Sequence, residues 1–376
     1  MSVQVSYKKQ TVFFIILLIL TLVLVEGLVR NLNVVSTSCS FTENELFSDY
    51  DYFTKKDMCF EYITLEYDFT TPIRLLEPNQ HGDYININSD GFRGNEFNFT
   101  SNNYKIIILG GSTIFGHVSS SDDTTIPGFL KQKFSDDEIN VEIINAGIPS
   151  GYSRSELYYL ENYILKYSPD LIILYDGAND GVEPIRDISY KEFNENEFFV
   201  NAGLEKNPKS KKSTYSTLLT KFEYKTGLGL AQFISKSLEK PKMIVNYDKL
   251  SDFSSKTMRL ENNWEQICSI ALENNFKSIN IIQPVIGTSD RILSETEKNI
   301  TVQVNSEFLN TINLNKSKIQ HCEAILDLRN SFEGMDEVTI YFDSTHMTDF
   351  GNKIIANKIY EKIIPIILEN IQFSKN

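Results

Sequence analysis

The sequence predicts an α/β protein, a three-layer α/β/α sandwich with a five-stranded parallel sheet and flavodoxin-like layering, joined to one N-terminal transmembrane helix. From residue 105 onward, short continuous apolar runs alternate with amphipathic stretches. Such runs are typical of parallel strands whose two faces are both covered by helices. The 376 residues, 41% of them hydrophobic, are enough for one large domain or two small ones.

The elements of this sheet are predicted from the spacing of apolar residues. Amphipathic stretches repeat apolar residues at i, i+3 and i+4, as Leu260, Trp264, Ile267, Cys268 and Ala271 do. The predicted strands cover 105–109, 141–145, 171–175, 278–282 and 324–328, and the predicted helices cover 126–134, 154–167, 257–274 and 352–371.

An apolar segment near the N-terminus is predicted to be a membrane anchor. Lys8 and Lys9 precede the apolar residues 12–25, and the run extends through Val29 with only Thr21 and Glu26 as interruptions. This length favours an uncleaved signal anchor, with a cleaved signal peptide as the alternative. Lysines on the N-terminal side place that end in the cytoplasm and the remaining chain outside it. We therefore expect a single-pass membrane protein with an extracytoplasmic domain.

The charge and the cysteine content limit which partners, disulfides and metal sites the chain can have. A formal charge of −14 leaves no broad basic patch, which argues against a nucleic-acid partner. Four cysteines in an exported chain permit two disulfides, most simply Cys39–Cys59 and Cys268–Cys322, with four buried free thiols as the alternative. None of the cysteines has the spacing of a metal site and the four histidines are scattered, so a structural zinc ion is not expected. The sequence implies no other metal or cofactor.

The chain divides into three predicted regions. These are an anchor at 1–30, an extracytoplasmic N-terminal segment at 31–100 and the α/β domain at 101–376. The segment from residue 182 to about residue 255 contains no clear buried strand and is too long for an ordinary loop. They are interpreted as a helical insertion that covers a site, or as a solvated excursion.

The first predicted strand ends in a candidate nucleophile. The apolar run from Lys105 stops at Gly110-Gly-Ser112, which leaves a hydroxyl at the carboxyl end of a strand. Ligands bind at that edge of open α/β sheets, although an ordinary strand-to-helix connection has the same pattern.

Other polar residues occupy comparable positions. Asp343 and His346 stand three residues apart before the last predicted helix, where a carboxylate can accept a hydrogen bond from an imidazole. A helix cap would explain this spacing equally well. Asn179 follows the third strand, where its amide could donate to an oxyanion or simply belong to a turn.

Together these motifs resemble the SGNH/GDSL hydrolase superfamily across most of residues 85–370. Gly110-Gly-Ser112 corresponds to the nucleophile block, Gly177-Ala-Asn-Asp180 to the Gly-x-Asn-Asp block and Asp343-x-x-His346 to the last block. Asp90-Gly-Phe-Arg-Gly94 is similar to a segment of a membrane-anchored subgroup.

The resemblance implies a role for each site residue. Ser112 would be the nucleophile, His346 the base and Asp343 the group that orients it, while Ser112 N–H and the Asn179 amide donate to the oxyanion. One extra residue in Asn145-Ala-Gly-Ile-Pro-Ser-Gly151 departs from the family pattern, so the remaining donor is assigned to Gly151, with Gly147 as the alternative. Asp176 has no predicted role beyond turn structure.

The function implied is a serine esterase that cleaves ester-linked acyl groups. Its substrates would be O-acetyl groups of surface carbohydrate, ahead of lipid esters. The alternatives are an acetyltransferase acting on extracellular polysaccharide and a non-catalytic surface binding protein with the same fold.

Overall fold

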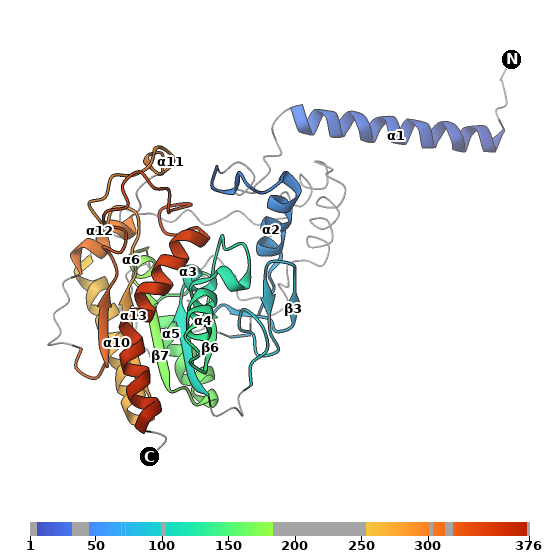
Figure 1. Cartoon of the computed structure of the whole chain (residues 1–376). Coiled ribbons are helices and arrows are strands. Elements are labelled where there is room, and N and C mark those ends of the chain that lie inside the picture. Colours follow the sequence, from blue (N-terminus) through green and yellow to red (C-terminus); the bar gives the residue numbers. More distant parts are fainter. Residues whose placement is uncertain are drawn as a thin grey trace. The chain divides into compact units, whose positions relative to one another are not determined.

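A computed structural model describes most of the chain (Figure 1). The described residues are 6–31, 45–68, 70–71, 73–98, 103–182, 253–300, 304–312 and 319–373. Helix α1 belongs to a different compact unit from the body formed by the later described residues, and each is described by itself. Most of the predicted insertion at 182–255 lies outside the described residues.

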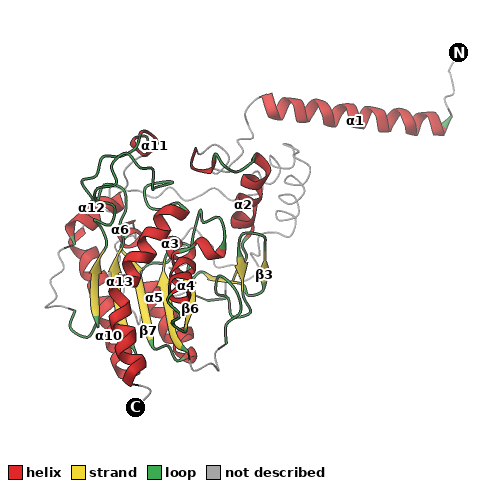
Figure 2. Cartoon of the chain, viewed as in Figure 1, coloured by secondary structure: helices red, strands yellow, loops and turns green. Residues whose placement is uncertain are grey.

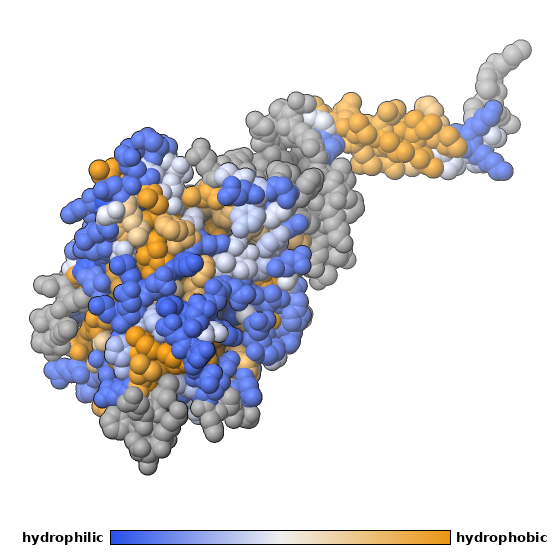
Figure 3. Space-filling view, in the orientation of Figure 1, coloured by the Kyte–Doolittle hydropathy of each residue, from blue (hydrophilic) through white to orange (hydrophobic). Residues whose placement is uncertain are grey.

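Helix α1 (Tyr7–Asn31) is the predicted apolar segment. Its stretch from Tyr7 to Leu28 is long and apolar enough to cross a membrane, and no part of it is buried. Figure 3 shows its surface as almost continuously hydrophobic. The helix therefore suits a membrane anchor or a signal sequence by length and composition.

The body contains the predicted five-stranded parallel sheet, which confirms the fold class (Figure 2). The strand order is β6-β5-β7-β8-β9. Central strand β7 is buried at every residue because neighbouring strands and both helical layers cover it. The strands are β5 (Tyr104–Gly110), β6 (Val141–Gly147), β7 (Leu171–Asp176), β8 (Lys277–Ile282) and β9 (Ala324–Asp327).

Helices cover both faces of the sheet, which makes three layers. Alternate residues of β5 point to opposite sides, so Ile106 and Ile108 join one core cluster and Ile107 and Leu109 join another. The first cluster includes residues of α4 (Ile126–Asp136) and α13 (Asp349–Phe373). The second includes residues of α5 (Ser153–Tyr159) and α10 (Phe253–Glu273).

Further short elements complete the described body. The predicted helix at 154–167 is α5 followed by η3 (Leu160–Ile164), a π-turn, and η4 (Leu165–Tyr167). Before the sheet lie η1 (Glu45–Phe47), α2 (Tyr52–Thr64), β1 (Tyr67–Asp68), β2 (Leu75–Leu76), β3 (Gln80–His81) and β4 (Asn86–Ile87). Within and after it lie α3 (Ser112–Phe115), η2 (Asp122–Thr124), α6 (Ala178–Val182), α11 (Glu295–Lys298) and α12 (Val304–Thr311).

Arg93 ties the segment before the sheet to the loop that follows α3. Its side chain is fully buried and pairs with Asp122 at 2.8 Å. Its Nη1 donates to the carbonyls of Phe115 at 3.0 Å and Gly116 at 2.8 Å. The peptide N–H of Arg93 also donates to Asn145 of β6 at 3.2 Å. These contacts attach the segment around Arg93 to the α/β body.

We expect Arg93→Met to destabilise the body by about 3–5 kcal/mol, because it leaves Asp122 and three carbonyls, those of Phe115, Gly116 and Tyr84, without their cationic donor. The measurement is the free energy of unfolding in urea. Lys133→Met is the matched control, since Lys133 forms an exposed i,i+4 pair with Asp137 and should change stability by about 0.5 kcal/mol. Equal effects of the two substitutions would contradict the role given to Arg93.

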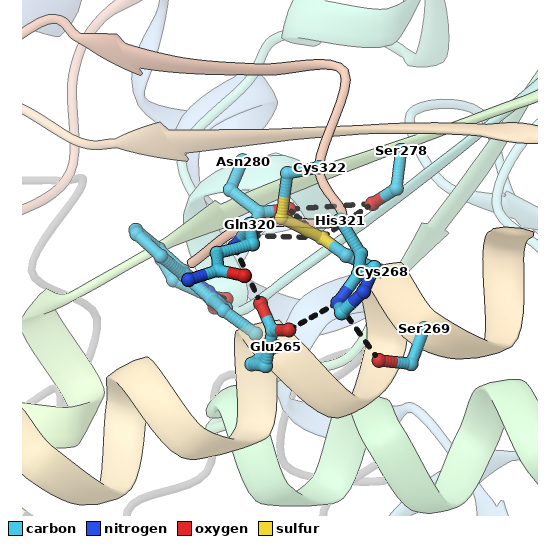
Figure 4. The surroundings of a disulfide bond; sticks show 10 residues. Glu265, Cys268, Ser269, Ser278, Asn280, Gln320, His321 and Cys322 are labelled. Atoms are coloured by element: carbon cyan, nitrogen blue, oxygen red, sulfur yellow. Dashed lines mark hydrogen bonds and ion pairs between the residues drawn. A yellow bond between two sulfur atoms is a disulfide. The ribbon is translucent and has the colours of Figure 1, made fainter. Parts of the chain in front are cut away.

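The predicted disulfide Cys268–Cys322 is confirmed (Figure 4). It joins α10 to the residues just before β9, and Asn280 of β8 donates to Cys322 Sγ at 3.3 Å. Nearby, His321 pairs with Glu265 of α10. Cys59 is also disulfide-bonded, which excludes the free-thiol alternative for these three residues. Its predicted partner Cys39 lies outside the described residues.

Candidate active site

Ser112 lies where strand β5 turns into α3. The strand ends at Gly110, and Ser112 is the first residue of the helix, so its hydroxyl stands at the carboxyl edge of the sheet. A Cβ atom at Gly111 would lie 2.5 Å from Asn179 Nδ2 and 2.8 Å from the Gly151 carbonyl. Glycine at 111 therefore allows three strand ends to meet closely beside Ser112.

Ser112, His346 and Asp343 form a continuous chain of hydrogen bonds. Ser112 Oγ lies 2.7 Å from His346 Nε2, and His346 Nδ1 lies 2.7 Å from Asp343 Oδ2. The other carboxylate oxygen, Oδ1, accepts from the peptide N–H groups of Thr345 and His346, both at 2.8 Å. The loop before α13 thus fixes the carboxylate on two sides and presents the imidazole to Ser112.

This hydrogen bonding controls the charge of Asp343. Burial by itself raises the pKa of a carboxyl group, but the hydrogen bond and charge of His346 and the two peptide N–H groups outweigh it. They lower the pKa of Asp343 to about 2. Asp343 is therefore an anion at neutral pH, able to hold the Nδ1 proton of the imidazole.

Asn179 and Gly151 face each other at the same edge. Asn179 Nδ2 donates to the Gly151 carbonyl at 2.6 Å, which leaves the second hydrogen of that amide for another acceptor. The N–H of Gly151 donates to the Ile148 carbonyl at 2.7 Å. Pro149 and Ser150, whose φ is +66°, form the centre of that turn. The Gly151 N–H would have to leave Ile148 to donate to an oxyanion, so its role stays a prediction.

Gly147, the alternative donor, has a packing role. Its N–H donates to Asn145 Oδ1 at 3.1 Å. A Cβ atom there would lie 2.2 Å from the backbone nitrogen of Phe115, so glycine lets β6 approach α3 closely.

Two aromatic residues that the sequence analysis missed, His117 and Tyr62, extend from His346 in a series of ring contacts. The ring of His117 packs edge-on against the His346 ring, with centroids 4.4 Å apart. The ring of Tyr62 of α2 contacts the ring of His117, with centroids 4.0 Å apart. Burial, and then the neighbouring His346, lower the pKa of His117 to about 3. The only available sequence signal was a histidine five residues after Ser112.

Three buried carboxyl groups interact with one another, and two of them, those of Asp176 and Asp180, flank Asn179 in the chain. Asp176 ends β7 and accepts from Trp264 Nε1 at 2.8 Å, so its role extends beyond the turn. Asp180 accepts from Ser153 Oγ at 2.5 Å. Burial raises the pKa of Glu156 well above its usual value, and the adjacent charge of Asp176 raises it further. This group anchors α5 and α10 beneath the strand end that carries Asn179.

We expect Glu156→Gln to become progressively more stable than the native chain as pH rises above about 4.5. Because the folded-state pKa of Glu156 is raised, folding takes up a proton that the unfolded chain has lost, and native stability falls as pH rises. Glutamine has no such proton, so the stability difference should grow by about 1.4 kcal/mol per pH unit until the folded group ionises.

Urea unfolding at pH 5, 6, 7 and 8 measures this difference. Glu161→Gln, at an exposed carboxylate, is the matched control for the substitution itself. A difference between Glu156→Gln and the native chain that stays constant with pH would contradict the proton uptake.

Comparisons with known proteins give structural likeness alone. No protein-family model matches the sequence, and no curated protein does. A solved structure assigned to the lipolytic G-D-S-L family, from Desulfitobacterium hafniense DCB-2, is similar at 12% identity and a TM-score of 0.38, covering 68% of this chain and 97% of that one. The acetyl xylan esterase AlAXEase is similar at 16% identity and a TM-score of 0.37, covering 69% of this chain and 99% of that one.

A third solved structure is a two-domain esterase active on acetylated mannans. It is similar at 13% identity and a TM-score of 0.36, covering 68% of this chain. This chain spans only 47% of that protein.

Proposed function

We propose that this chain is a serine esterase of the SGNH/GDSL type that cleaves carboxylic esters through Ser112, His346 and Asp343. The observation that carries the proposal is the hydrogen-bonded chain from Ser112 Oγ through His346 to Asp343, with both links at 2.7 Å. A nucleophile, a base within reach of its proton and a group that orients the base are what acyl transfer requires.

The chemistry follows from this geometry. Ser112 Oγ attacks the ester carbonyl while His346 Nε2 takes its proton, and Asp343 stabilises the imidazolium that forms. The tetrahedral oxyanion accepts from Ser112 N–H, from the second hydrogen of the Asn179 amide, and from Gly151 N–H once it leaves Ile148. His346 then protonates the departing alcohol. Water hydrolyses the acyl-serine by the same steps in reverse.

Two alternatives to a hydrolase are a non-catalytic surface binding protein and an acetyltransferase. A surface binding protein with this fold would not need Ser112, His346 and Asp343 in one hydrogen-bonded chain, so the two 2.7 Å contacts favour an enzyme. Transfer of the acyl group to a glycan would be favoured if residues 182–255 formed a water-excluding cover over the site, and most of these residues lie outside the described ones. Hydrolysis is the reaction proposed because it is the one that the family resemblance implies.

Location and family resemblance guide the substrate class. Lys8 and Lys9 lie in the first turn of α1, ahead of its apolar residues, which favours a single-pass anchor with the body outside the cytoplasm. Substrates there would be extracytoplasmic esters. We favour O-acetyl groups of surface carbohydrate over lipid esters as the substrate class.

The direct test uses the full chain in detergent with a fluorophosphonate probe and with p-nitrophenyl acetate. We expect one molecule of probe per chain, located on Ser112 by peptide mass spectrometry, and loss of acetate release after labelling. Labelling at a residue other than Ser112, or no labelling with no hydrolysis, would refute the proposal.

A further inference from the structure

His117 lies beside the pair His346 and Asp343 and adds a third side chain that can bind a metal ion. His117, His346 and Asp343 each offer a nitrogen or carboxylate oxygen, and these three atoms all lie within 4.8 Å of one another. All three residues are partly exposed. Two imidazoles and one carboxylate are a ligand set found around zinc.

We propose that His117, His346 and Asp343 form a binding site for Zn²⁺ and that the bound ion inhibits the enzyme. Ligand atoms on one zinc ion lie about 3–3.5 Å apart, so the three atoms need to close by less than about 2 Å. Three protein ligands leave the fourth tetrahedral position for water. Hard cations such as Mg²⁺ prefer oxygen ligands and are not expected to compete.

Inhibition follows from how the ring of His346 is used. Its Nε2 contacts Ser112 Oγ and its Nδ1 contacts Asp343 Oδ2, both at 2.7 Å. A metal on Nε2 takes the lone pair that accepts the serine proton. A metal on Nδ1 replaces the hydrogen bond that orients the ring. A bound zinc ion and a working Ser112–His346 pair therefore exclude each other.

His117 is the ligand that makes the site testable. It comes from the loop directly after α3, and its own peptide N–H donates to the Ser112 carbonyl at 2.8 Å, so its backbone is fixed beside the nucleophile. Its imidazole contacts the ring of His346 and is not one of the links of the Ser112–His346–Asp343 chain. Substituting it removes a zinc ligand and keeps both residues that His346 uses.

Zinc binding to the full chain is measured by isothermal titration calorimetry in detergent. We expect one Zn²⁺ per chain, and an affinity at least about tenfold weaker in His117→Gln, because one of three protein ligands is lost. His81→Gln, at an exposed histidine of β3, is the matched control and should bind as the native chain does. No binding by the native chain, or equal affinity in His117→Gln, would overturn the site.

The inhibitory effect rests on the proposed esterase function and has its own measurement. For the native chain and for each variant, the rate of fluorophosphonate labelling with Zn²⁺ is divided by the rate that the same protein shows without metal. We expect saturating Zn²⁺ to lower this ratio at least tenfold in the native chain and EDTA to restore it. The ratio of His117→Gln should stay close to one at the same Zn²⁺ concentration.

The outcomes separate the two proposals. A native chain that binds zinc through His117 and still reacts at its metal-free rate refutes the inhibition. A native chain that never labels without metal refutes the esterase, while the calorimetry still decides whether the zinc site exists.

Discussion

Replacing Ser112 by alanine is expected to reduce the turnover of p-nitrophenyl acetate by about 10⁶-fold. Ser112 Oγ is the atom that His346 Nε2 contacts at 2.7 Å, and no acyl-enzyme can form without it. Because the effects of triad residues are not additive, removing His346 as well should cost little more. Initial rates at saturating substrate measure the loss, with circular dichroism to confirm folding.

The matched control for this substitution is Ser135→Ala. Ser135 is an exposed serine on α4, so its replacement should leave both turnover and unfolding midpoint as in the native chain. If Ser112→Ala retains more than about one hundredth of native turnover, the nucleophile lies elsewhere.

Asp343→Asn is expected to reduce turnover by about 10⁴-fold while leaving the fold intact. The carboxylate accepts from His346 Nδ1 and from two peptide N–H groups, whereas an asparagine has only one acceptor oxygen to offer them. The imidazole then loses the partner that fixes its tautomer. Since the pKa of Asp343 is about 2, the native carboxylate provides this partner throughout the pH range of an ordinary assay.

Asp136→Asn provides the comparison for this second substitution. Asp136 is an exposed carboxylate at the end of α4, and its replacement should leave kcat within about twofold of native. An Asp343→Asn variant that keeps a tenth or more of native kcat would mean that another group orients His346.

The central sheet could be predicted because its signal is local. Strand β7 is buried at all of its residues, so its apolar run from Leu171 stands out in the sequence. The segment before the sheet gave no comparable signal, since β1 to β4 have two residues each. Arg93 shows the reason: its partners Asp122 and Phe115 are distant in sequence, and only the folded chain brings them together.

The site was predictable to the extent that its residues fall in short motifs. Ser112, Asn179, Asp343 and His346 each stand in a recognisable block, and the structure brings them to one edge. The extra residue near Gly151 could not be placed from sequence, because the result depends on Ser150 adopting a positive φ. His117 was missed because a single histidine carries no pattern, and its contact with His346 arises from the fold.

The strand order has a consequence for the timing of synthesis. Ser112 and Asn179 belong to β5 and the residues after β7, whereas Asp343 and His346 follow β9, the last strand of the sheet. Ribosomes deliver the chain from its N-terminus, so a nascent chain acquires its serine and amide well before its base. Under the proposed mechanism, the growing polypeptide cannot turn over esters until residue 346 has emerged. The proposed activity would then arise in one late step, when the central sheet is complete.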